Sequence, residues 1–267
     1  MSGVTIKTAV DIEILRRAGK ILADILSELE AVAKVGITSF ELEKTALKLT
    51  KKAGAKPAFL GYTPQGASRP YPAALCLSIN DVVVHGIPNA VSYTLKDGDL
   101  VTLDMGISYK GMIVDSATTI GVGDVDSKGK QLLKAGKEAL DAAVEICKHW
   151  TEKKVSIKTG DIGMAIEKAG EYYRKTYGFN FAEGLGGHGV GYYVHEDPFI
   201  PNFGKPGQGV VLKPGMVIAI EPILNEGDER ITLDDDDYTY RTFDGKRSVH
   251  FEHTVLITEK GAEVLTA

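Results

Sequence analysis

Four carboxylates stand inside apolar, strand-like runs of the sequence. Asp104 follows Leu-Val-Thr-Leu, Asp115 follows Gly-Met-Ile-Val, Glu221 follows Met-Val-Ile-Ala-Ile, and Glu252 lies within Val-His-Phe-Glu-His-Thr-Val-Leu. A single acid of this kind usually marks the end of a strand beside a turn. For the pair Asp104 and Asp115, this structural explanation and a functional role are equally plausible. Four together are hard to explain as solvated surface, because a buried carboxylate without a partner costs several kcal/mol. Acids that share a site at neutral pH need metal to hold them ionised.

Three histidines stand near these runs. His188 lies in Gly-Leu-Gly-Gly-His-Gly-Val-Gly, which predicts a loop in which glycine lets the histidine approach other backbone closely. Such a loop could instead cradle a phosphate, but neither a helical pattern nor a P-loop lysine follows it. His85 and His195 also occupy predicted turns, although a single histidine is more often structural. One histidine and four carboxylates suit Mn, Co, Fe or Zn, and two bridging carboxylates would hold two ions for metal-assisted hydrolysis.

Helices and strands must bring these residues together. Apolar residues at three- and four-residue steps predict helices over 12–32, 38–53, 127–150 and 161–177. Thr8 and Asp11 form a predicted capping box before the first helix. The proline- and aromatic-rich stretch 57–72 predicts an ordered loop. β-Branched runs predict strands at 74–79, 81–85, 100–107, 112–115, 215–224, 238–243 and 249–258. Lys110 and Gly111 predict a hairpin turn.

The order helix, helix, strands occurs twice, and two short motifs repeat with it. Val-His-Gly-Ile-Pro around His85 matches Val-His-Glu-Asp-Pro around His195. Leu-Lys-Asp-Gly before Asp104 matches Leu-Lys-Pro-Gly before Glu221. The matches are short, so duplication and chance are balanced on this ground alone. A duplication would divide a single domain, 1–267, into halves of roughly 8–120 and 121–264.

The composition is that of an ordinary globular protein and excludes several classes of protein. The chain has 267 residues, of which 43% are hydrophobic and 25% charged, with a formal net charge of −5. These values exclude general disorder, a coiled coil and a disulfide-built miniprotein, and they argue against nucleic acid as a partner. The two cysteines, Cys76 and Cys147, suit a reducing cytoplasm. No apolar run reaches the length of a membrane span, and the first residues lack a signal-peptide pattern.

The ordered set of five candidate ligands resembles that of the pita-bread metallopeptidases, and its flanks are similar to those of type I methionine aminopeptidases. The similar stretches are Cys-Leu-Ser-Ile-Asn-Asp-Val-Val-Val-His-Gly-Ile-Pro (76–88), Gly-His-Gly-Val-Gly (187–191), His-Glu-Asp-Pro (195–198) and Phe-Glu-His-Thr (251–254). The resemblance extends over about 8–264. It implies an α+β pita-bread fold, with a pseudo-twofold curved antiparallel sheet covered by helices. It also implies an enzyme, a hydrolase that removes the N-terminal methionine when the second residue is small.

The resemblance further implies a role for each candidate ligand. Asp115 and Glu252 would bridge two divalent ions (Co, Mn, Fe or Zn), and Asp104 would complete one metal site. His188 and Glu221 would complete the other site. Glu221 would also act as the general base toward the attacking water.

Other residues receive roles from the same resemblance. His195 would stabilise the tetrahedral intermediate, and His85 would contact the scissile amide or its nitrogen. The methionine pocket would be lined by Phe59, Tyr62, Tyr71, Cys76 and Tyr238. An aromatic slot suits a thioether, although core packing would also explain these rings. A monovalent cation, Na or K, would be held by carbonyls near Asn80, Val82 and Ser248. The expected protein is a cytoplasmic monomer that acts on nascent polypeptide N-termini, with the ribosome as a candidate partner.

The sequence departs from this family in three places. The loop 61–72 is longer than in the compact bacterial form, the linker between Asp115 and His188 is also extended, and His250 stands where a glutamine is commoner. Period-two alternation places His250 on the same strand face as Glu252, so it is a candidate for a further group beside the metals. The acidic run 234–237 predicts a solvated loop, or a region that attracts cationic substrate N-termini if Tyr238 lies at the pocket.

Two other interpretations stay open. Proline-specific aminopeptidases and prolidases share this fold but usually carry an additional N-terminal domain, whereas two helices and a loop are predicted before the first strands here. The short interval from Glu221 to Glu252 also argues against the type II methionine aminopeptidases. A non-catalytic binding protein on this fold would typically have lost ligands, and this chain keeps all five.

Overall fold

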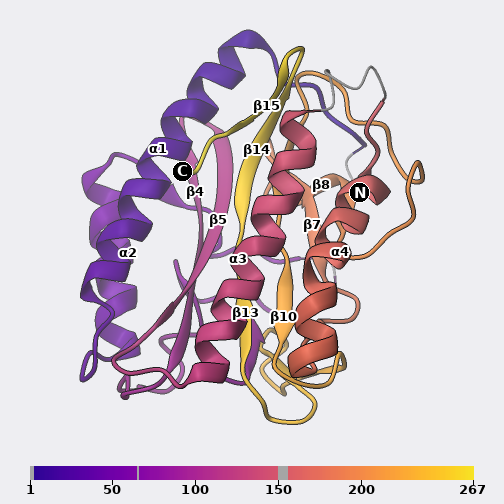
Figure 1. Ribbon diagram of the computed structural model, residues 1–267. Helices are drawn as coiled ribbons and strands as arrows, with labels where there is room; N and C mark the ends of the chain where they lie inside the picture. The colour runs from indigo at the N-terminus through magenta and orange to yellow at the C-terminus, as the bar shows by residue number, and fades with distance from the viewer. Residues whose placement is uncertain (1–2, 65, 150–155) are drawn as a thin grey trace.

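The computed structural model describes residues 3–64, 66–149 and 156–267 (Figure 1). Its helices are α1 (Ala9–Val32), α2 (Ser39–Lys52), α3 (Ser127–Lys148) and α4 (Thr159–Tyr177). They lie where the apolar periodicity predicts them, while Trp150, at the end of the third predicted helix, is outside the described residues. Within the described ranges, no helix combines the length and the apolar character that crossing a bilayer requires.

Local capping explains where the first helices begin. Thr8 accepts a hydrogen bond from the Asp11 backbone, and the Asp11 carboxylate accepts one from Thr8 N–H, so the predicted capping box before α1 is confirmed. Thr38 and Glu41 form the same arrangement before α2. Each box satisfies backbone donors that the first helical turn leaves unpaired.

The strands form two larger and two smaller sheets among the described residues. The first larger sheet contains β1 (Lys56–Pro57), β2 (Cys76–Ile79), β4 (Leu100–Tyr109) and β5 (Met112–Gly121), all joined through β4. The second contains, in order, β15 (Gly261–Val264), β14 (His253–Thr258), β9 (Val217–Ile220), β7 (Gly186–Gly189) and β8 (Glu196–Pro201). The smaller sheets are β13 (Ser248–His250), β10 (Ile223–Asn225) and β6 (Asn180–Phe181), and β11 (Ile231–Leu233), β12 (Tyr240–Thr242) and β3 (Val82–Val84). The described strand pairs are antiparallel, which with the helices confirms the α+β class.

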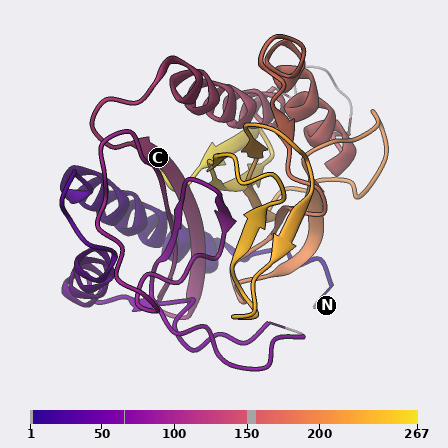
Figure 2. The same ribbon diagram turned by 90° about the horizontal axis from the view of Figure 1, so that it is seen from below.

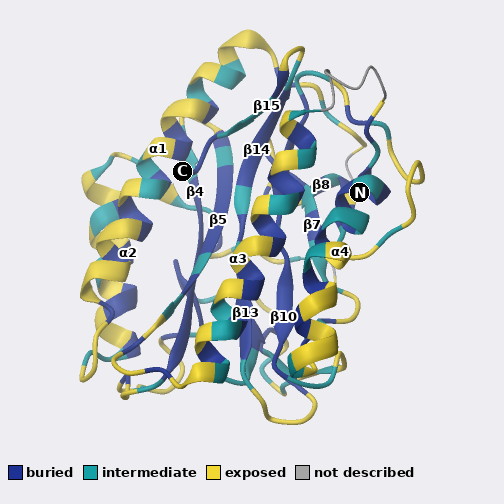
Figure 3. Ribbon diagram, viewed as in Figure 1, coloured by how far each residue is buried: buried dark blue, intermediate teal, exposed yellow. Residues whose placement is uncertain are grey.

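Each larger sheet has its own helical cover. Helix α1 packs on β4 and β5 beside α2, whereas α3 and α4 pack together over the strands of the second sheet (Figures 1 and 2). The helices bury one face and expose the other, so apolar clusters form between each helix pair and its sheet (Figure 3). The repeated order of two helices and then strands agrees with the proposed halves, 8–120 and 121–264, which stay a prediction.

The two larger sheets meet beside Asp115. The Thr254 hydroxyl on β14 donates to the Asp115 carbonyl at 2.7 Å and accepts from the Asp115 N–H at 2.9 Å. Next to this contact, Glu252 forms an isolated antiparallel bridge with Ala117 of β5. Strand β5, from the first half of the chain, is therefore held against Glu252 and β14, from the second half.

The predicted strands 215–224 and 249–258 are each interrupted at an acid. Strand β9 ends before Glu221, and β10 starts after the proline that follows it. Strand β13 ends at His250, and β14 starts after Glu252. Burial still follows the predicted alternation, because His250 and Glu252 are 2% exposed while Phe251 between them is half-buried.

The glycine-rich stretch around His188 is a strand, not the loop that its composition predicts. It forms β7, between β8 and β9. A Cβ atom on Gly187 would lie 2.2 Å from the Ala219 carbonyl oxygen, and one on Gly189 would lie 2.3 Å from the Asp197 carbonyl oxygen. The glycines therefore serve close approach of neighbouring backbones rather than flexibility.

Candidate metal centre and substrate pocket

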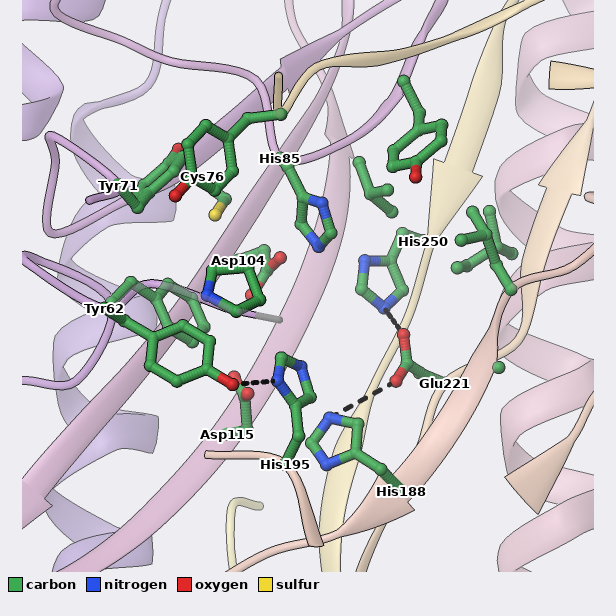
Figure 4. A pocket seen from close by; sticks show the side chains of 18 of the residues that line it. Tyr62, Tyr71, Cys76, His85, Asp104, Asp115, His188, His195, Glu221 and His250 are labelled. Carbon is green, nitrogen blue, oxygen red and sulfur yellow. Dashed lines mark hydrogen bonds and ion pairs between the residues drawn. The ribbon is translucent and has the colours of Figure 1, made fainter. Parts of the chain in front are cut away.

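The five candidate ligands line one cavity of about 660 Å³, and Figure 4 labels Asp104, Asp115, His188 and Glu221 in it. Asp104 comes from β4, Asp115 from β5 and His188 from β7, while Glu221 and Glu252 occupy the two strand interruptions. Segments that are far apart in the sequence thus contribute their polar side chains to the same space.

Strand register explains how the two aspartates share a face. Asp104 pairs with Ala117 and Asp115 pairs with Gly106, so the two carboxylates are diagonal neighbours on the β4–β5 ladder. Gly106 adds no side chain opposite Asp115, and a Cβ atom there would lie 2.7 Å from the Phe59 ring. The glycine therefore lets the Phe59 ring pack against the strand beside the carboxylates.

Burial raises the pKa of all four carboxyls, and repulsion by neighbouring acids adds to the shift of three of them. Burial, together with the neighbouring acids, raises the pKa of Asp115 to about 8 and raises the pKa values of Asp104 and Glu252 well above their usual range. Burial also raises the pKa of Glu221 to about 8. No lysine or arginine of the described residues forms an ion pair with these acids, and Asp115 Oδ1 and Glu252 Oε1 are buried without a hydrogen-bond donor. Such a group is stable in the ionised state only with a cation.

The donor set fits a metal ion. Ligand atoms of Asp115, His188 and Glu252 lie within 4.8 Å of one another. Nδ1 of His188 lies 2.9 Å from the Gly189 carbonyl oxygen, which it contacts as a donor, so the lone pair is on Nε2. That Nε2 atom lies 3.6 Å from Oε1 of Glu221. Carboxylates with a neutral imidazole suit divalent ions of borderline to hard character.

His85 and His195 also line the cavity. The His195 ring lies 4.5 Å from the His188 ring, centroid to centroid, and its Nδ1 lies 2.9 Å from the Tyr62 hydroxyl (Figure 4). Burial raises the Tyr62 pKa, so the phenol keeps its proton. When this phenol donates to Nδ1, the hydrogen of neutral His195 is left on Nε2. Burial lowers the pKa of His85 to about 4, so this imidazole is neutral at pH 7.

The five predicted pocket residues form one side of the cavity: Phe59, Tyr62, Tyr71, Cys76 and Tyr238. Cys76 pairs with Asp104 in the β2–β4 register, so the apolar side of the cavity adjoins the acids directly. Tyr71 and Tyr238 pack edge to face at 5.1 Å between centroids. The Tyr71 hydroxyl donates to the Gly86 carbonyl at 2.8 Å.

The residues expected at a monovalent cation lie together, away from the lining of this cavity. The Ser248 N–H donates to the Asn80 carbonyl at 2.7 Å. Asn80 has φ 54°, and Val82 begins β3 two residues later. The cation itself stays a prediction.

The acidic run 234–237 is an ordered turn. Asp234 pairs with Arg241, and Asp236 accepts hydrogen bonds from the backbone N–H groups of Tyr238 and Thr239. Asp237 accepts a hydrogen bond from Ser68 and lines the cavity, so the run connects the long loop to the pocket. Whether it attracts substrate N-termini stays a prediction.

One supporting contact was not predicted from the sequence. Lys7 forms a buried ion pair with Glu196 at 2.5 Å. The Glu196 carboxylate also accepts from the N–H groups of Tyr192 and Tyr193, so it holds the turn that leads to His195. The partners are far apart in the chain, and no short motif indicates the pair.

Comparison with known proteins places the chain among metallopeptidases. Residues 13–259 match the model of "Metallopeptidase family M24". A methionine aminopeptidase from Aquifex aeolicus is 46% identical, with 96% of each chain covered, and one from Clostridium perfringens is 39% identical, with 98% of each covered. The crystal structure of the Thermotoga maritima methionine aminopeptidase matches with a TM-score of 0.90 at 42% identity, over 98% of this chain and 99% of that one. Prolidase from Pyrococcus furiosus matches with a TM-score of 0.73 at 26% identity, and 65% of its longer chain is covered. These likenesses confirm the pita-bread fold.

Proposed function

The chain belongs to metallopeptidase family M24, and we infer that it is a metal-dependent aminopeptidase that removes the N-terminal methionine from polypeptides. One observation carries this function beyond the family assignment. Three buried acids, the partly exposed Glu221 and His188 line the same cavity as an aromatic slot that suits a thioether side chain. A substrate methionine in that slot would place its peptide bond beside the acids.

We propose that the centre holds two divalent ions. Asp115 and Glu252 would bridge them, Asp104 would complete one site, and His188 with Glu221 would complete the other. When bound, such ions lower the pKa of water and polarise a carbonyl group. The unpaired buried oxygens of Asp115 and Glu252 support the bridging assignment. The ions that we expect in this centre are Co, Mn, Fe or Zn.

The side chains around the peptide bond have separate roles. Glu221 takes the proton of the attacking water as general base and delivers it to the leaving amine. His195 presents Nε2–H, because Tyr62 occupies Nδ1, and this hydrogen stabilises the oxyanion of the tetrahedral intermediate. His85 lies across the cavity, next to the ring of Tyr240, and contacts the nitrogen of the scissile amide. The free α-amine of the substrate lies on the side of the acids, which restricts cleavage to the first residue.

Substrate and cellular setting follow from the same assignment. We expect cleavage when the second residue is small, and nascent polypeptide N-termini are the expected substrates. Cys76 and Cys147 are buried free thiols, which suits a reducing cytoplasm. We propose that the enzyme acts there as a monomer, with the ribosome as candidate partner and Na or K near Asn80.

Hydrolysis of short peptides tests the function against its alternatives. Metal-stripped protein is titrated with Mn and with Co and assayed on Met-Ala-Ser and on Ala-Pro-Ser. We expect metal-dependent release of methionine that is lost in Glu221→Gln. Cleavage of Ala-Pro-Ser alone would assign the chain to the proline-specific peptidases of this fold. Silence on both peptides with every metal would favour a binding protein.

A further inference from the structure

A fourth imidazole, that of His250, lies in the cavity and has no part in the roles above. His250, on β13, is 2% exposed. Neither of its ring nitrogens has a hydrogen-bond partner among the described residues. A buried polar group left unpaired costs about 1–3 kcal/mol, so a side chain of this kind calls for a functional explanation.

The His250 ring is directed at one oxygen of Glu221. Its Nε2 atom lies 3.4 Å from Oε2 of Glu221, whereas Nε2 of His188 lies 3.6 Å from Oε1 (Figure 4). The two imidazoles therefore face different oxygens of the same carboxylate. The next acid, Glu252, is farther away, with its Oε2 atom 3.8 Å from the His250 nitrogen.

The backbone of His250 is fixed from two sides. Its N–H donates to the Thr119 hydroxyl oxygen at 2.9 Å, and that hydroxyl donates to the His250 carbonyl at 2.8 Å. On the other side, His250 pairs with Ile223, two residues after Glu221. The backbone that carries the ring therefore cannot move away from Glu221 without disturbing two strands.

We propose that His250 is a positioning residue for Glu221. Its Nε2–H donates to Oε2 and so keeps Oε1 turned toward His188, where Glu221 and His188 would together hold a metal ion. The separation of 3.4 Å is longer than an ordinary hydrogen bond, and contacts of this kind tighten when an active site is loaded. The proposal rests on the metal centre described above, and it explains why a buried imidazole is kept beside that centre.

Metal binding by the stripped protein tests the proposal without an activity assay. Co(II) is added to wild type, His250→Gln, His250→Asn and His250→Leu, and binding is followed by visible absorption. The glutamine amide reaches about as far as Nε2, the asparagine amide is too short, and leucine has no donor. We expect Co(II) affinity to fall about 10–100-fold in the leucine and asparagine variants and by less than about threefold in the glutamine variant.

A matched control is available on the neighbouring strand. His253, on β14, contacts the Thr266 hydroxyl through Nδ1 at 3.1 Å and does not line the cavity, so His253→Leu should leave Co(II) affinity unchanged. Circular dichroism and melting of the metal-free variants check folding, and if the leucine variant is unfolded, the glutamine and asparagine variants decide alone.

Two results would overturn the positioning role. Equal affinity in every His250 variant would show that the ring only fills space. A loss in His250→Gln as large as in His250→Leu would mean that the imidazole binds the ion directly. A different result would contradict the proposed function: wild-type protein that binds Co(II) but does not cleave Met-Ala-Ser. In that case, the order of Co(II) affinities among the variants would still decide the role of His250.

Discussion

A single hydroxyl connects the aromatic slot to His195, the proposed donor to the oxyanion. Tyr62 belongs to the aromatic slot, yet its oxygen lies 2.9 Å from Nδ1 of His195. Occupation of the slot and the orientation of His195 are therefore physically linked. A histidine without this partner could rotate or place its hydrogen on the wrong nitrogen, and the oxyanion would lose a donor.

We expect Tyr62→Phe to lower kcat on Met-Ala-Ser about 5–10-fold, the equivalent of one ordinary hydrogen bond of about 1 kcal/mol. KM should change little, because the ring that contacts methionine stays in place. Steady-state kinetics on the metal-loaded protein measures both constants. Tyr172→Phe, on the exposed face of α4, is the control and should behave as wild type. An unchanged kcat in the pocket variant would refute the link.

At the scale of elements, β7 lies so close to the backbone of β9 that a side chain at Gly187 would not fit between them. A Cβ atom on Gly187 would lie 2.2 Å from the Ala219 carbonyl oxygen of β9. Strands β7 and β9 would then have to separate, and His188 would move with them.

We expect Gly187→Ala to destabilise the protein by roughly 1–3 kcal/mol or more and to weaken metal binding, because the strand that carries His188 shifts. Urea unfolding and metal titration of the stripped protein measure the two effects. Gly3→Ala is the matched control, since a Cβ atom there meets no atom within 4 Å. A variant as stable as wild type would mean that the strands adjust without cost.

The segment before α1 is a second supporting element. Lys7 and Glu196 are almost fully buried, and Glu196 gathers the N–H groups of the turn before His195. The helix beyond it adds a further contact, because Asp11 accepts a hydrogen bond from the Tyr192 hydroxyl. The beginning of the chain thereby supports a turn at the active site.

We expect Lys7→Met to cost about 3–5 kcal/mol of stability, because it leaves the buried Glu196 carboxylate unpaired. It should also lower kcat, since the turn that carries His195 loses its anchor. The double variant Lys7→Met, Glu196→Gln should regain part of the stability, because the remaining amide is neutral. Thermal unfolding and kinetics of the three proteins decide this, and additive losses would contradict the explanation.

At the scale of the whole molecule, local patterns predicted those features that depend on near neighbours. The capping boxes, the helices and the hairpin at Lys110 and Gly111 need only residues a few positions apart. The ordered acids with their flanks also identified the side chains that the fold gathers in one cavity. Their roles as ligands stay a proposal.

Features that depend on distant partners were not predictable in the same way. Glycine around His188 predicts a loop that approaches other backbone closely, but the sequence does not show that this backbone belongs to neighbouring strands, at Ala219 and Asp197. Lys7 and Glu196 form an ion pair although they are 189 residues apart in the sequence, so no short window contains both residues. Tertiary contacts therefore decided the secondary structure of β7 and the support of His195.

The four clustered acids should make the stability of the whole metal-free protein depend on pH. Without metal, burial raises the pKa of Asp115 and Glu221 to about 8, and those of Asp104 and Glu252 well above their usual range. In the unfolded chain these groups ionise near pH 4. At pH 7 the folded state therefore holds protons that the unfolded state has released, and by linkage its stability falls as pH rises toward 8. The buried histidines oppose this only weakly, because burial lowers their pKa values in the folded state, while the unfolded imidazoles, with a pKa near 6.5, hold only a fraction of a proton above pH 7.

We expect the melting temperature of metal-stripped protein to be lower at pH 8 than at pH 7, by on the order of 5 °C, since each such carboxyl contributes about 1.4 kcal/mol per pH unit. Asp104→Asn removes one of these groups and should reduce the slope. Saturating Mn should abolish it, because the cation keeps the acids ionised in the folded state and stabilises that state by binding. Calorimetry at both pH values, with and without Mn, measures all four conditions. A melting temperature that stays level or rises in the stripped protein would mean that the acids are already ionised without metal, and that the folded chain compensates their charge by itself.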